Sequence, residues 1–97
     1  MTEARITDEG GGRFAVTGPL TFDTVHTLLA LPAVEGPVVV DLGGVPRADS
    51  AGLALMLEWL RQARQHERAL TFTRVPARLQ DLIDVSGLSA LFGQRPA

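Results

Sequence analysis

The hydrophobic positions of this chain follow two spacings, one typical of strands and the other of helices. Apolar and polar residues alternate over residues 13–17 and 70–74, which predicts two strands. Residues 38–40 are three consecutive valines, and such a run favours a strand that is buried on both faces. Residues 4–7 predict a short edge strand. Residues 8–12, with three glycines, predict the turn that joins it to the next strand, because glycine tolerates the positive φ of tight turns.

Helical spacing appears in three segments between and after these strands. Residues 21–31 place Phe22, Val25, Leu28 and Leu29 on one face, and Pro32 ends that predicted helix. A long helix is predicted from about Ser50 to Glu67, and a third one over residues 77–85, with Leu79, Leu82 and Ile83 facing inward. Leu88, Leu91 and Phe92 are expected to pack back as a final turn, and residues 93–97 to fray.

The predicted order is therefore β-β-α-β-α-β-α. Strands that alternate with helices indicate an α/β fold in which helices pack on a mixed, four-stranded sheet. The 97 residues are enough for one domain, which we expect to span residues 1–97.

The long helix has a clear core face and one flank that is harder to interpret. Its apolar core positions are Leu53, Met56, Leu57, Leu60 and Ala63, and Glu58, Gln62 and Gln65 lie opposite them. Leu55 and Trp59 are four residues apart and belong to neither group, so they form a flank of their own. Trp59, the only tryptophan, either covers the edge of the core or acts as an energetic hot spot for a partner protein.

The start of this helix presents an acid and a hydroxyl. Asp49 and Ser50 are both residues that cap the free N–H groups of a first helical turn, so their role is either purely structural or regulatory. In the regulatory interpretation, a kinase phosphorylates Ser50. The added charge of about −1.5 to −2 then switches partner binding.

The segment "VVVDLGGVPRADSAGLALMLEWL", which starts at Val38, resembles the STAS domain family (sulfate transporter and anti-sigma factor antagonist). The resemblance is carried by an apolar strand ending in Asp41-Leu42, then Val45, then Asp49-Ser50-Ala51-Gly52 before a long helix. Within that family the chain is most similar to the MlaB-like group, the small cytoplasmic STAS subunit of the Mla phospholipid-transport ABC system. The likeness includes the ending "VPARLQDLIDVSGLSALF" and covers almost the whole chain.

The resemblance implies a non-enzymatic regulatory subunit that binds the ATPase of an ABC phospholipid transporter and supports outer-membrane lipid asymmetry. It implies a regulatory hydroxyl at Ser50. It also implies a partner-binding surface at the helix start and on its exposed side, made of Asp49, Ser50, Ala51, Leu55, Glu58, Trp59 and Gln62. The alternative is an anti-sigma factor antagonist, whose partner is a serine-kinase anti-sigma factor that phosphorylates Ser50.

Composition narrows the remaining function classes. The net charge is −2 without a basic stripe, which argues against nucleic acid, and no apolar run reaches the roughly 20 residues that span a bilayer. The chain has no cysteine, and the spacing of His26 and His66 suggests no metal site, so we expect neither metal nor cofactor. The first residues lack a signal-peptide core, which favours a cytoplasmic protein that reaches the inner membrane through its complex. A hydrolase with Ser50 as nucleophile is a third, weak hypothesis, because no G-x-S-x-G motif is present.

Overall fold

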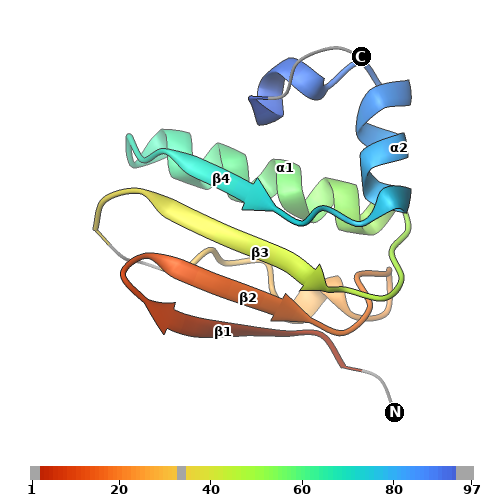
Figure 1. Cartoon of the computed structure of the whole chain (residues 1–97), viewed down its shortest axis with the longest axis horizontal. Helices are drawn as coiled ribbons and strands as arrows, with labels where there is room; N and C mark the ends of the chain where they lie inside the picture. Colours follow the sequence, from red (N-terminus) through yellow and green to blue (C-terminus); the bar gives the residue numbers. More distant parts are fainter. Residues whose placement is uncertain (1–2, 33–34, 94–97) are drawn as a thin grey trace.

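The fold is built on one mixed sheet, which carries the long helix on one of its faces. The computed structural model describes residues 3–32 and 35–93. The strands are β1 (Arg5–Gly10), β2 (Arg13–Thr17), β3 (Val38–Gly44) and β4 (Leu70–Thr73), and the helices are α1 (Ser50–Gln65) and α2 (Ala77–Val85). Two short 3-10 helices, η1 (Val25–Thr27) and η2 (Ser89–Phe92), complete the elements (Figure 1).

The four strands lie in the spatial order β1-β2-β3-β4. β1 and β2 form an antiparallel hairpin, and β2–β3 and β3–β4 pair in parallel, so the prediction of a mixed, four-stranded sheet in an α/β fold is confirmed. The two parallel connections run through residues 18–37 and through α1.

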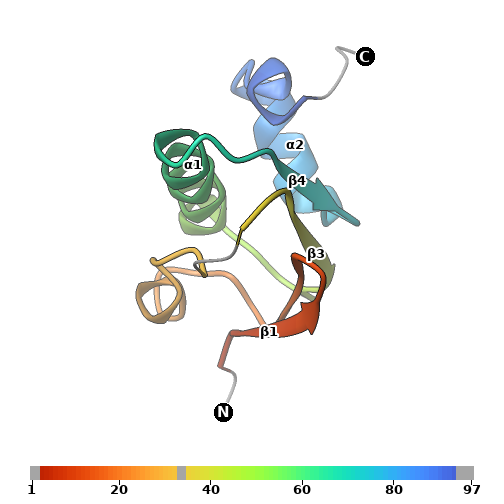
Figure 2. The same ribbon diagram turned by 90° about the vertical axis from the view of Figure 1, so that its left-hand side faces the viewer.

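Only one face of this sheet is covered. Figure 2 shows α1 and the η1 region on the same side of the strands. Along β3 the buried residues Val38, Val40 and Leu42 alternate with the half-buried Val39 and Asp41. The expectation that the valine run is buried on both faces is therefore wrong, because no helix of the described residues covers the face of Val39.

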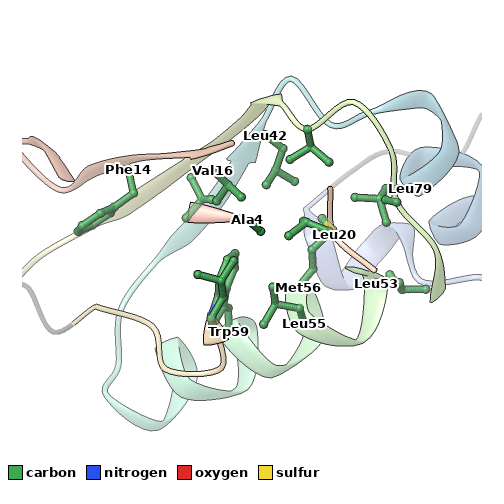
Figure 3. Packing of buried hydrophobic residues seen from close by; sticks show 14 of the residues in the cluster. Ala4, Phe14, Val16, Leu20, Leu42, Leu53, Leu55, Met56, Trp59 and Leu79 are labelled. Carbon is green, nitrogen blue, oxygen red and sulfur yellow. The ribbon is translucent and has the colours of Figure 1, made fainter. Parts of the chain in front are cut away.

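The core lies between the sheet and α1. Figure 3 shows Trp59 and Met56 pointing from α1 toward the strands, where they meet side chains such as Val16. The ring of Trp59 stacks on Phe72 of β4 with centroids 6.4 Å apart, and Phe92 of η2 packs on the same Phe72 at 5.7 Å. The expected final turn thus exists and contributes Phe92 to the core, whereas Leu91 is 40% exposed.

Several elements begin or end at other residues than the sequence predicts. β1 extends to Gly10, so the turn shrinks to residues 11–12, and β3 continues through two glycines that were expected in a loop. α1 ends at Gln65 and β4 at Thr73, each slightly earlier than predicted, and α2 has the expected bounds. Of the tail that was expected to fray, residues 94–97 lie outside the described part of the chain.

The α-helix predicted over residues 21–31 does not form, and this is the largest error of the sequence analysis. Only the three residues of η1 are helical. The hydroxyl of Thr24 donates to the carbonyl of Pro19 at 2.7 Å and accepts from the amide of Thr21 at 2.9 Å. These local bonds favour a turn over a continuing helix. Phe22 and Leu29, which were predicted to face the core, are 75% and 52% exposed.

Candidate functional site

Two loops run side by side and place the start of α1. The amide of Gly18 donates to the carbonyl of Gly44 at 3.0 Å, and that of Leu20 donates to the carbonyl of Arg47 at 2.9 Å. The amide of Asp49 donates in turn to the carbonyl of Leu20 at 3.1 Å. The first turn of α1 is consequently fixed beside the segment that begins at residue 21.

Asp49 is the N-cap of α1 and also joins the two loops. Its Oδ1 accepts from the amide of Ala51 at 2.8 Å, and its Oδ2 accepts from the amide of Phe22 at 3.4 Å. A carboxylate at this position satisfies free N–H groups and lies at the favourable end of the helix dipole. Asp49 is therefore a helix cap, as one of its two interpretations predicted, and both of its carboxylate oxygens are used within the domain.

Gly52 allows the close approach of these segments. A Cβ atom at this position would lie 3.1 Å from the carbonyl oxygen of Leu20 and 3.3 Å from a methyl group of Leu79. The glycine of the Asp49-Ser50-Ala51-Gly52 motif is therefore explained by packing: α1 lies directly against the loop at residue 20.

An apolar groove lies between α1 and residues 21–31, which we call the strap. Its volume is about 790 Å³. The strap contributes Phe22, Val25, Leu29 and Ala30, and α1 contributes Ser50, Ala51, Ala54, Leu55, Glu58 and Gln62. Five of the seven residues predicted for partner binding therefore line one groove, at whose end the exposed Ser50 lies.

Glu58 and Gln62 form the polar rim of this groove. Glu58 accepts from Arg61 at 2.7 Å and 2.9 Å, and its Oε2 also accepts from Nε2 of Gln62 at 2.7 Å. These donors lower the pKa of Glu58 to about 2, with the hydrogen bonds from Arg61 as the largest cause. Glu58 is therefore a fixed negative charge at neutral pH.

The hypothesis that Trp59 offers its ring to a partner is wrong. Trp59 is 0% exposed, and its Nε1 donates to the carbonyl of Leu28 at 2.9 Å. The alternative, that Trp59 covers the core, is the one that the structure supports. The Leu55 side chain is also largely buried, at 2% exposure, and it offers the groove only a small part of its surface.

The strap side of the groove does not follow from the sequence pattern. That pattern predicts Phe22 and Leu29 in the core and does not single out Ala54. Phe22 directly follows Thr21, and the spacing of the apolar residues does not show whether the side chain at position 22 is exposed or buried. The signal for its role is the 75% exposure of a large aromatic side chain, and only the structure supplies it.

The site contains no constellation for metal binding among residues 3–32 and 35–93, where no group of three or more His, Asp or Glu side chains converges. His26 and His66 are exposed, and neither lines the groove with Ser50. No helix in that same part of the chain is long and apolar enough to cross a membrane.

Comparison with known families agrees with this architecture. A family model described as "Mlab, STAS domain" matches residues 5–93. The chain belongs to the STAS domain family. No curated protein sequence matches it.

Solved structures support the STAS fold at low sequence identity. A sulfate transporter family protein from Wolinella succinogenes is 18% identical and has a TM-score of 0.66, and the match covers 92% of this STAS domain and 76% of that chain. The murine anion transporter Solute Carrier 26 family member A9 is 15% identical with a TM-score of 0.62, covering 94% of this domain but 17% of that transporter. Both similarities concern the fold, and the second concerns a small part of a much longer protein.

Proposed function

We propose that this STAS domain is a non-enzymatic subunit that docks through its groove on the ATPase of an ABC phospholipid transporter. The observation that carries the proposal is the apolar groove beside Ser50, with the exposed Phe22 on its rim. The family description "Mlab, STAS domain" supports the choice of transporter. The domain would act at the cytoplasmic side of the inner membrane, where the transporter holds it, without inserting into lipid itself.

The chemistry of the groove supports binding over catalysis. A serine nucleophile needs a base beside it, and none of the histidines lines the groove. The one ionisable residue that lines the groove within the described part of the chain is Glu58, and a carboxylate with a pKa of about 2 is a very weak base at neutral pH. The hydrolase hypothesis therefore gains no support from the residues around Ser50.

The effect on the ATPase would be thermodynamic. A subunit that binds one ATPase conformation more tightly than another shifts the population toward the first. Apolar contact with Phe22 and Leu29 would supply affinity, while Glu58 at the rim would favour a cationic partner side chain.

Titration calorimetry with the purified ATPase of the same organism's phospholipid transporter tests this proposal. Phe22→Ser should weaken binding by about tenfold or more, because large aromatic side chains that become buried at an interface are among those whose truncation costs at least that much. Val85→Ser is the matched control: Val85 is 87% exposed, does not line the groove, and should leave the affinity unchanged. Equal affinities of Phe22→Ser and the unchanged protein would refute docking through this groove.

A second candidate function is the partner switch of an anti-sigma factor antagonist. It is favoured by the exposure of Ser50 at the first position of α1, where the described residues show no hydrogen bond from its hydroxyl. The kinase partner should phosphorylate Ser50, and Ser50→Asp should then abolish binding to that kinase. A Ser50 that stays unmodified during incubation with the kinase removes this candidate.

A further inference from the structure

One wall of the groove is not a regular secondary-structure element. Local turns shape the first part of the strap, as in the bond of 3.0 Å from the amide of Val25 to the carbonyl of Thr21, whereas residues 29–31 make no backbone–backbone hydrogen bond within the described part of the chain. The strap nevertheless carries Phe22 and Leu29, whose exposed apolar side chains define the groove. The position of residues 29–31 must therefore come from contacts with α1.

Two side chains of α1 supply these contacts at the distal end of the strap. Gln62 accepts at Oε1 from the amide of Leu31 at 2.8 Å and donates from Nε2 to the carbonyl of Leu29 at 2.8 Å. Trp59 donates to the carbonyl of Leu28 from the buried side. One amide and two carbonyls within residues 28–31 are thus bound by two side chains that lie three positions apart on α1.

Gln62 is in turn oriented by a charged pair. Its Nε2 also donates to Oε2 of Glu58, which the guanidinium of Arg61 holds through a salt bridge of 2.7 Å. The carboxamide therefore has a fixed orientation: Nε2 faces Leu29 and Glu58, and Oε1 faces Leu31. Gln65, one turn further along and exposed, makes no bond to the strap within the described residues.

We propose that Gln62 is a positioning residue that locks residues 28–31 against α1 and so keeps the groove open at the width a partner requires. This inference rests on the proposed function, because it assigns to Gln62 the preorganisation of that docking site. A wall that is already fixed loses less conformational entropy on binding, and affinity rises accordingly. The family resemblance implies that Gln62 is a polar contact to the partner, whereas in this proposal Gln62 acts by holding Leu29 in place.

The variant Gln62→Met separates the two roles. Methionine keeps the length and contact area of the side chain but cannot form the bonds to Leu29 and Leu31. Amide exchange measured by NMR in the isolated domain should become at least about tenfold faster for Leu31, while the amide of Val38, bonded to the carbonyl of Ala69, keeps its rate. Gln65→Met, the matched control, should leave both rates unchanged. An unchanged Leu31 rate in Gln62→Met would overturn the proposal.

Binding to the transporter ATPase provides the second readout. Gln62→Met should weaken it by about tenfold and Gln65→Met should not. If Leu31 exchanges faster but the affinity is unchanged, while Phe22→Ser weakens binding, the positioning role is wrong and the proposed docking site stands. If neither Phe22→Ser nor Gln62→Met changes the affinity, the docking site itself is wrong and the positioning role fails with it.

Discussion

Replacing Trp59 by alanine should strongly destabilise the domain rather than merely remove a binding contact. Trp59 is fully buried, stacks on Phe72 and donates a hydrogen bond to Leu28. A tryptophan buries roughly 200 Å², which at about 25 cal/mol/Å² corresponds to about 5 kcal/mol of transfer free energy. Measured Trp→Ala truncations in cores cost about 3–5 kcal/mol. Because domains of this size are stable by only about 5–15 kcal/mol, the variant should be marginal.

The corresponding loss in melting temperature is about 12–40 °C, since each kcal/mol lowers it by about 4–8 °C in a domain of this length. The assay is urea and thermal unfolding followed by far-ultraviolet circular dichroism, because the variant lacks the only tryptophan and has no fluorescence signal. Gln65→Ala, an exposed site on the same helix, should change the free energy of unfolding by less than about 0.5 kcal/mol. A loss below about 1.5 kcal/mol in Trp59→Ala would refute the core assignment and return Trp59 to the surface.

Three further predictions concern the elements around the groove. Gly52→Val should destabilise the domain, because branched carbons cannot fit where even a Cβ lies 3.1 Å from the carbonyl of Leu20; chemical denaturation measures this. Asp49→Ala should cost about 1–2 kcal/mol of unfolding free energy through the lost cap, with faster exchange of the Ala51 amide as a local readout. Asp41 accepts two hydrogen bonds from Arg74, which lower the pKa of Asp41 below 3.8, so its contribution to stability is present above that pH and lost as the pH falls further. The melting temperature should therefore fall on acidification below about pH 4, and Asp41→Asn should reduce that dependence.

Much of the sheet and both α-helices were predictable because their residues follow the geometry of the element itself. Alternation over residues 13–17 and 70–74 places Phe14, Val16 and Phe72 toward the core, as observed. The bounds of α2 were predicted without error. The start of α1 was also predictable, since Asp49 is an acid placed directly before an apolar helical pattern and caps it in the structure.

The strap was not predictable by the same reasoning. Phe22, Val25 and Leu29 have helical spacing, yet they are spaced to line a groove along α1 rather than to enter the core. The spacing shows that these side chains would point in the same direction. It does not show whether they face the core or the groove. The bonds that replace helical hydrogen bonds come from Trp59 and Gln62, which are more than thirty residues away in sequence.

By itself the sequence determined the α/β fold, the sheet elements, both α-helices and the presence of Ser50 at a capped helix start. These features depend on local geometry and on periodic burial, which a sequence records directly. Only the tertiary structure decided that Trp59 faces the core, that Gln62 binds the strap, and that Phe22 is exposed beside Ser50. The reason is physical. α1 packs against the sheet on one side and against the strap on another, so two of its sides are apolar. Contacts between distant parts of the chain decide which segment covers each side.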